Sequence, residues 1–188
     1  MKNFKSLDID YLSQDTPIIY CDGTKVYDKL KKEYITHKKG IFIYAPSGVG
    51  KTWYINHQIE PHFIDGDYLW GLCGALPKGA WWLSSDEDID RFERRADTIT
   101  EQAKKLGFFI MGASRVSVVP DAIVIPTLET HLKYLKARES HYDGGLKSDN
   151  MEAIKSSRER TLKAKGPNTL MFESIEQACE YFLKQEKE

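Results

Sequence analysis

The feature that most constrains the fold is a short apolar run followed at once by a glycine-rich loop and a helical stretch. Residues 40–44 (Gly-Ile-Phe-Ile-Tyr) are compact and apolar, as in a strand that is buried on both faces of a parallel sheet. The loop at 45–52 reads Ala-Pro-Ser-Gly-Val-Gly-Lys-Thr, and a helical pattern continues to about residue 59. A strand joined to a helix in this way predicts an α/β protein with a parallel sheet.

The rest of the chain alternates between strand and helix signals in the same manner. Besides the strand at 40–44, we expect strands at 62–65, 108–111, 122–125 and 169–172, and one short strand at 18–20. We expect helices at 26–34, from 84 to 106, from 127 to 138, around 150–163, and from 174 onward. The prediction is a three-layer α/β fold, in which helices cover both faces of a five-stranded parallel sheet and a lid segment is added.

Two of these helices begin with a recognisable cap. Ser84 with Glu87, and Ser174 with Gln177, have the spacing of a capping box, and Gly107 is placed to end the first of the two helices. Residues 68–83, between the second strand and the long helix, are aromatic and contain glycine, and we expect them to be irregular.

Composition excludes several classes of protein. The chain has 188 residues, enough for one domain with a lid or an extension, and its net charge of −1 gives no general attraction to nucleic acid. It has no run of 18 apolar residues and no apolar signal segment near its start, so we expect no membrane association. Its three cysteines are far apart, which argues against a disulfide or zinc framework. A cytoplasmic protein is expected.

The glycine-rich loop carries the sharpest functional signal. Its end fits the phosphate-binding pattern G-x-x-x-x-G-K-[ST], although Ala45 stands where the pattern has its first glycine. In such a loop, backbone N–H groups surround phosphate oxygens, the lysine contacts the β and γ phosphates, and the threonine hydroxyl is a ligand of Mg²⁺. We therefore predict a site for ATP and Mg²⁺ made by Ser47, Gly48, Val49, Gly50, Lys51 and Thr52.

An acidic turn follows the second strand. Asp65-Gly66-Asp67 would lie at the carboxyl edge of a parallel sheet, where ligands collect. A carboxylate there can bind the acceptor, take a proton from its hydroxyl, or hold Mg²⁺ through water. The alternative is an ordinary turn, because Asp-Gly is a common turn dipeptide.

A locally basic stretch lies in the second half of the chain. Residues 133–165 contain nine Lys and Arg against five Asp and Glu, and 139–168 are polar enough for a mobile lid. Arg138 is the best candidate for stabilising charge in the transition state, and Arg115, just past the third strand, is a candidate for substrate binding. The alternative for any of these residues is a solvated helix face.

The segment 68–83 suggests the kind of acceptor. It contains Tyr68, Trp70, Trp81 and Trp82, and flat aromatic rings favour stacking on a base over binding a sugar acid. Packing of these tryptophans in the core is the alternative. On this basis Trp70 is predicted to bind the acceptor.

Together these motifs, in this order, resemble the P-loop kinases of small molecules and nucleotides, which include the nucleoside monophosphate, gluconate, shikimate and adenylylsulfate kinases and the kinase domain of polynucleotide kinase. The resemblance covers about residues 40–186. It implies a kinase domain at 40–188 with its lid at 139–168, and an N-terminal extension at 1–39 to which we assign no role. It also implies that Asp67, which matches the base of polynucleotide kinases, is catalytic together with Lys51 and Arg138.

The chain departs from this group at its third strand, which ends in Met111-Gly-Ala-Ser-Arg115 without the usual acidic residue. Mg²⁺ would then depend on Thr52 and Asp67. A short match, Arg138-Glu-Ser-His141-Tyr142, is similar to the start of the lid in gluconate kinases.

The expected function is transfer of the γ-phosphate of ATP to a nucleotide, a nucleoside or a hydroxymethylated base, free or in DNA. The alternatives are a sugar-acid kinase of the gluconate type and a P-loop ATPase or nucleotide-binding module. A non-catalytic nucleic-acid-binding domain is disfavoured by the neutral net charge.

Overall fold

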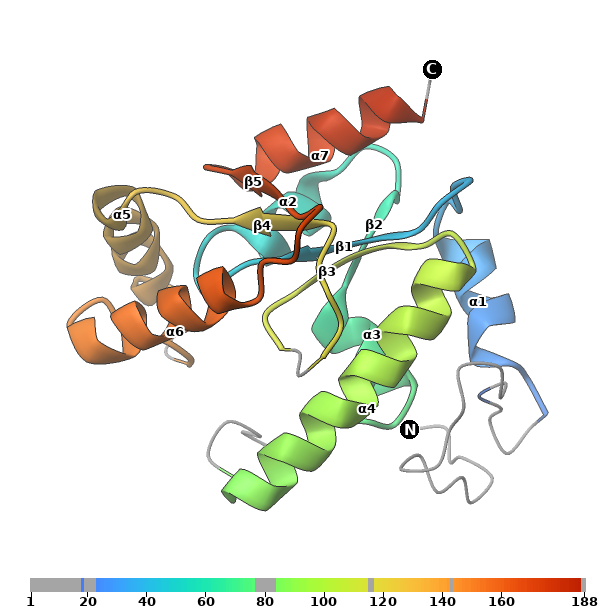
Figure 1. Ribbon diagram of the computed structural model, residues 1–188, viewed down its shortest axis with the longest axis horizontal. Coiled ribbons are helices and arrows are strands. Elements are labelled where there is room, and N and C mark those ends of the chain that lie inside the picture. The colour runs from blue at the N-terminus through green and yellow to red at the C-terminus, as the bar shows by residue number, and fades with distance from the viewer. Residues whose placement is uncertain (1–17, 19–22, 77–83, 115–116, 143, 187–188) are drawn as a thin grey trace. The chain divides into compact units, whose positions relative to one another are not determined.

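A computed structural model describes residue 18 and residues 23–76, 84–114, 117–142 and 144–186 (Figure 1). Five strands form one all-parallel sheet in the order β2-β3-β1-β4-β5, which confirms the predicted α/β class and the five-stranded parallel sheet. The strands are β1 (Ile41–Tyr44), β2 (Phe63–Asp65), β3 (Phe109–Gly112), β4 (Ala122–Val124) and β5 (Leu170–Phe172).

Seven helices lie among the described residues. They are α1 (Val26–Glu33), α2 (Lys51–His57), α3 (Gly66–Leu72), α4 (Asp86–Lys105), α5 (Leu128–Glu139), α6 (Met151–Lys163) and α7 (Ile175–Gln185). Of the strand expected at 18–20, residues 19 and 20 lie outside the described residues.

The strand order reverses direction at β1. From β1 the chain moves to one side of the sheet, to β2 and β3, and then crosses to the other side of β1, where β4 and β5 follow. Ligands of open parallel sheets bind beyond the carboxyl ends of the strands at such a reversal. The segment that leaves the carboxyl end of β1 is the glycine-rich loop.

The chain divides into two compact units, which we describe separately. Unit 1 comprises Met1–Ile41, Ile59–Ile110 and Ser114–Val118, and unit 2 comprises Phe42–Gln58, Met111–Ala113 and Val119–Glu188. The domain boundary expected at residues 39 and 40 stays a prediction.

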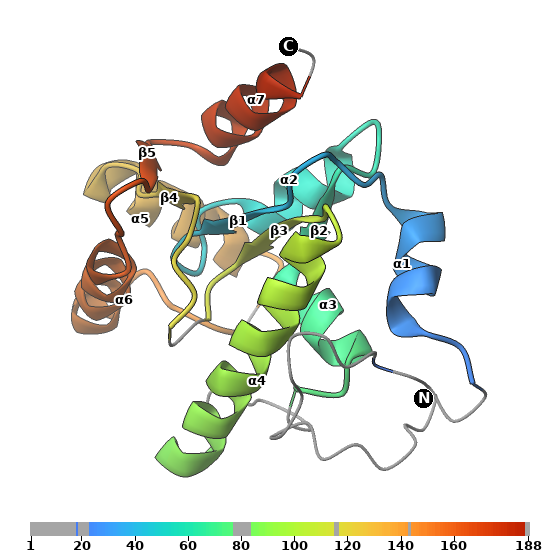
Figure 2. The ribbon, with the colours of Figure 1, turned by 45° about the vertical axis from the view of Figure 1, so that its right-hand side comes forward.

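The core of unit 1 is formed around α4, with α1 and α3 (Figure 2). The long helix buries an apolar stripe at the predicted three- and four-residue spacing, which includes Phe92, Ala96 and Ile99. The hydroxyl of Tyr27 on α1 donates to Gln102 Oε1 near the carboxyl end of α4 (2.8 Å). This hydrogen bond connects α1 to α4.

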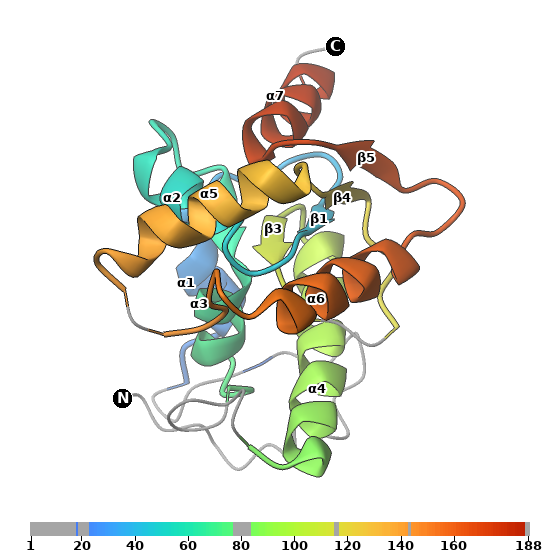
Figure 3. The same cartoon turned by 90° about the vertical axis from the view of Figure 1, so that its left-hand side faces the viewer.

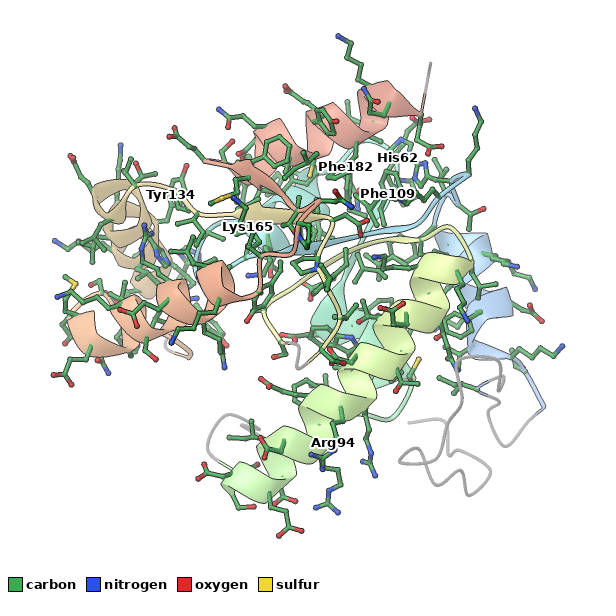
Figure 4. The ribbon with its side chains drawn as sticks, viewed as in Figure 1. His62, Arg94, Phe109, Tyr134, Lys165 and Phe182 are labelled. Carbon is green, nitrogen blue, oxygen red and sulfur yellow. The ribbon has the colours of Figure 1, made fainter. Side chains whose placement is uncertain are left out.

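Unit 2 contains β4 and β5 with α2, α5, α6 and α7. β4 lies between its two neighbours, with Ala122 opposite Ile43 of β1 and opposite Leu170 of β5. Phe182 of α7, labelled in Figure 4, packs on Phe172 of β5 with ring centroids 6.4 Å apart. The C-terminal helix is thereby fixed to the edge strand.

Two local predictions were wrong. The long helix α4 is capped by Ser85, whose hydroxyl accepts from the Asp88 N–H (3.2 Å), one residue later than the expected Ser84 with Glu87. Part of the segment expected to be irregular is the helix α3. The cap expected at Ser174 is confirmed, since its hydroxyl accepts from the Gln177 N–H (3.2 Å).

None of the helices in the described part of the chain combines the length and the apolar character needed to cross a bilayer.

Candidate functional site

The loop at 45–50 connects β1 to α2 in unit 2 and is folded around a lysine. Lys51 Nζ donates to the carbonyl oxygens of Ala45 (2.9 Å) and Pro46 (2.7 Å), so the side chain reaches back across the loop. Gly48 and Gly50 adopt positive φ angles of 83° and 99°, in the left-handed region that favours glycine. The two glycines and the lysine of the motif therefore define the shape of the loop.

Several amide groups of this loop are available for a ligand. The N–H groups of Ser47, Gly48 and Gly50 have no hydrogen-bond acceptor among the described residues. Unpaired backbone donors within a few residues of one another, beside an ammonium group, suit the oxygens of a polyphosphate. This donor set fits the predicted binding of ATP phosphates.

One face of helix α5 packs against the loop. His131 Nε2 lies 2.8 Å from the Ser47 carbonyl oxygen, and Arg138 Nη1 donates to Ser47 Oγ (3.4 Å). Between them, Leu135 touches Gly48 so closely that an added Cβ would come within 2.3 Å of Leu135 Cδ2. The three residues follow the i, i+4, i+7 spacing of one helix face. We call them the α5 stripe; in Figure 3 the loop between β1 and α2 runs alongside α5.

Arg138 lies in a partly enclosed position. Its guanidinium donates to the Leu146 carbonyl and lies over the Tyr142 ring, with Cζ 5.5 Å from the ring centroid. Its Nε–H group is buried and has no hydrogen-bond partner among the described residues. Burial lowers the pKa of Arg138 from its ordinary value, but the guanidinium stays charged. The predicted catalytic arginine is therefore a cation in contact with the loop.

His131 is fully buried at the loop, and no motif in the sequence pointed to it. Arg158 of α6 approaches its other ring nitrogen, with Nη1 3.5 Å from Nδ1. Burial, followed by the nearby charges of Arg158, Lys51 and Arg138, lowers the pKa of His131, while its bond to Ser47 acts in the opposite direction. The ring is therefore neutral at pH 7. The only sequence signal would have been its spacing from Leu135 and Arg138.

Thr52 lies in the first turn of α2 and is exposed, directly after the lysine. A hydroxyl oxygen at this place suits Mg²⁺, which keeps several water ligands and uses few from the protein. Among the described residues, no three His, Cys, Asp or Glu side chains gather as a metal site. Thr52 is therefore the candidate Mg²⁺ ligand in unit 2.

The two aspartates at the junction of β2 and α3 in unit 1 have different roles. Asp65 is the N-cap of α3, and its Oδ1 accepts the backbone N–H of Asp67 (2.9 Å). The side chain of Asp67 lies in the first turn of the helix and is exposed. The acidic turn is thus the start of helix α3. Asp65 caps the helix, and the side chain of Asp67 lies on its surface.

Trp70 does not lie where an acceptor could stack on it. It is fully buried in unit 1, its Nε1–H donates to Thr100 Oγ1 (3.1 Å), and it packs edge-on against Phe92 with ring centroids 5.7 Å apart. The alternative interpretation, packing in the core, fits Trp70, and the prediction that it binds the acceptor is contradicted by its burial. Trp81, Trp82 and Arg115 lie outside the described residues.

Within unit 2 the structure brings together Ser47, Gly48, Lys51 and Arg138 from the predicted site, and adds His131 and Arg158. Asp65, Asp67 and Trp70 belong to unit 1. No protein-family model matches this chain, and no curated protein matches its sequence. The case for a function therefore depends on the residues themselves.

Proposed function

We propose that the chain has the three-layer P-loop kinase fold and is an ATP-dependent phosphotransferase. The observation that carries this proposal is the meeting of Lys51 and Arg138 on one glycine loop whose amides at Ser47, Gly48 and Gly50 lack acceptors among the described residues. Backbone donors with two cations suit a polyphosphate, and the sheet order with its reversal at β1 supports a nucleotide site beyond the carboxyl end of that strand.

The loop and its cations would act on the donor. Its amides would bind phosphate oxygens, and the Lys51 ammonium would leave the carbonyls of Ala45 and Pro46 for the β and γ phosphates. Arg138 would stabilise the negative charge that develops on the transferred group, through donors such as its unpartnered Nε–H. Thr52 would hold Mg²⁺, which would neutralise part of the phosphate charge. As the sequence predicts, Asp67 would be a further ligand, directly or through water.

Asp67 is the proposed general base. The acceptor hydroxyl oxygen forms a bond to the γ-phosphorus, the bond from that phosphorus to the β–γ bridging oxygen breaks, and ADP leaves with the electron pair. The hydroxyl proton goes to the carboxylate of Asp67. Asp65 suits this role less well, because its Oδ1 is already used to cap α3.

The proposed acceptor is a nucleotide, a nucleoside or a hydroxymethylated base, free or within DNA. With Trp70 assigned to the core, this choice depends on the aromatic residues Trp81 and Trp82 of the sequence and on Tyr68, which is partly exposed. Stacking on such rings would select a base.

The test is a screen of acceptors with ATP labelled on its γ-phosphate, using the full chain and the Lys51→Ala variant. We expect label on an acceptor that carries a base, and no label with Lys51→Ala. Transfer by Lys51→Ala at the rate of the unchanged chain, with equal thermal stability, would refute the kinase assignment. Efficient labelling of gluconate, with no response to any nucleotide acceptor, would replace the proposed acceptor by a sugar acid.

A further inference from the structure

We propose that His131 is a positioning residue of the phosphate loop: it orients the peptide between Ser47 and Gly48 toward the ligand and holds Arg158 of α6 beside the loop. This inference deepens the proposed function and rests on it. It assigns a role to a buried polar side chain that the phosphate-binding pattern does not contain.

The orientation of the peptide follows from its planarity. Nε2 of His131 lies 2.8 Å from the Ser47 carbonyl oxygen, so the ring must carry its proton on Nε2 and donate it to that oxygen. In a trans peptide the C=O and the following N–H point in opposite directions. With the Ser47 carbonyl held toward α5, the Gly48 N–H points away from α5.

The Gly48 amide is one of those with no acceptor among the described residues. Leu135 of α5 packs on Gly48, and its Cδ2 leaves no room for a Cβ at this glycine. His131 and Leu135 thus contact the two residues that this peptide joins, and the Gly48 N–H is left to donate to a phosphate oxygen on the side away from α5. A free carbonyl in that direction would instead repel a phosphate oxygen.

The second part of the role concerns Arg158. With the proton on Nε2, Nδ1 of His131 is an acceptor, and Arg158 Nη1 lies 3.5 Å from it. The neutral ring thus connects the loop to α6. A leucine in its place would fill the space without holding either partner.

The contacts of His131 with Ser47 and Arg158 require a neutral ring. A protonated ring would have no acceptor for Arg158, and it would add a fourth positive charge to Arg158, Lys51 and Arg138. Burial and these three charges lower the pKa of His131, which agrees with the neutral form that the geometry requires.

The experiment measures binding of inorganic tripolyphosphate to the full chain labelled with ¹⁵N-glycine, which gives a signal for Gly48 among the 13 glycines. The variants are His131→Gln, His131→Leu, Arg158→Met and the double variant His131→Leu/Arg158→Met. Glutamine can donate to Ser47 and accept from Arg158, whereas leucine can do neither. Urea unfolding of each variant reports its stability separately.

We expect His131→Leu to weaken tripolyphosphate binding about tenfold, as for the loss of one or two hydrogen bonds, and to reduce the shift of the Gly48 amide signal. His131→Gln should remain within about threefold of the unchanged chain. Arg158→Met should cost about tenfold by itself but less than about twofold in the leucine background, because the arginine is held there by His131.

Different results separate the two proposals. If the unchanged chain fails to bind tripolyphosphate, the proposed function falls and this inference falls with it. If the unchanged chain binds, but His131→Leu binds equally well with the same Gly48 shift, the inference alone is refuted. If His131→Leu does not fold, binding by His131→Gln that is tenfold weaker, or an unchanged affinity in Arg158→Met, would refute it.

Discussion

The loop after β1 and the segment after β2 both begin at the carboxyl end of a parallel strand, yet they use their polar groups differently. In the loop, the amides of Gly48 and Gly50 lack acceptors among the described residues, while Lys51 holds the loop together from within. In the segment after β2, Asp65 caps a helix and Trp70 is buried in a core.

This difference predicts that substitutions in the loop after β1 affect ligand binding, whereas most substitutions after β2 affect stability. The carbonyl oxygens of Ala45, Pro46 and Ser47 accept hydrogen bonds within unit 2, whereas the N–H groups of Ser47, Gly48 and Gly50 have no acceptor among the described residues. The segment after β2 contributes mostly to the fold of unit 1, and Asp67 lies exposed in the first turn of α3.

The largest effect is expected from Asp67→Asn. An amide cannot take the acceptor proton, so kcat should fall by about 10² to 10⁴ while ATP binding changes little. The matched control is Asp65→Asn, because asparagine is also a good N-cap and should leave kcat near its original value. Damage by Asp65→Asn with a silent Asp67→Asn would reverse the two roles.

Trp70→Ala should lower the free energy of unfolding by about 3–5 kcal/mol, as for other buried aromatic residues. Trp70→Phe keeps most of the packing and loses the bond to Thr100, so a loss of about 1 kcal/mol is expected. Urea unfolding measures both values. An unchanged stability with a raised KM for the acceptor would restore Trp70 to the acceptor pocket.

Arg138→Ala should lower kcat by about 10² to 10³, because a charge-stabilising donor beside the loop is lost. Lys136→Ala removes an exposed positive charge from the same helix and should leave kcat unchanged. Steady-state kinetics on the labelled acceptor compare the two. Equal effects of both variants would indicate a general charge effect and no specific role for Arg138.

The smallest effect concerns the pH dependence of stability. His131 has a lowered pKa in the folded chain, whereas it titrates near 6.5 when unfolded, so below that pH the unfolded state binds more protons. Stability should therefore fall as the pH drops from 7.5 to 5.5, by up to about 1.4 kcal/mol from this residue.

Comparison with His131→Gln isolates this contribution, because the other four histidines are present in both proteins. Urea unfolding at the two pH values should show a smaller loss in the glutamine variant. An equal loss in both proteins would mean that His131 becomes protonated in the folded chain.

The elements that could be predicted from the sequence are those with a strong local signal. The apolar run 41–44, the stripe of α4 and the glycines at 48 and 50 each define their structure within a few residues. The helix α3 was missed because Gly66 and Gly71 suggest a turn. It forms nevertheless, since Asp65 caps it and Leu69 and Trp70 are buried.

The functional role of a residue was harder to predict where it depends on distant partners. His131 is 84 residues from Ser47 and 27 from Arg158, and no local pattern connects them. The burial of Trp70 likewise depends on Thr100 and Phe92 of another helix. The aromatic residues of segment 68–83 did not by themselves distinguish packing in a core from binding of an acceptor.

The central claim is that the loop at 47–52 binds the phosphates of ATP, and equilibrium dialysis with labelled ATP and Mg²⁺ tests it most directly. We expect the unchanged chain to bind one ATP, Lys51→Ala to bind it about 10 to 100 times more weakly, and Lys155→Ala, an exposed change on α6, to bind it equally well. Absence of ATP binding, or equal affinity in Lys51→Ala and the unchanged chain, would contradict the claim.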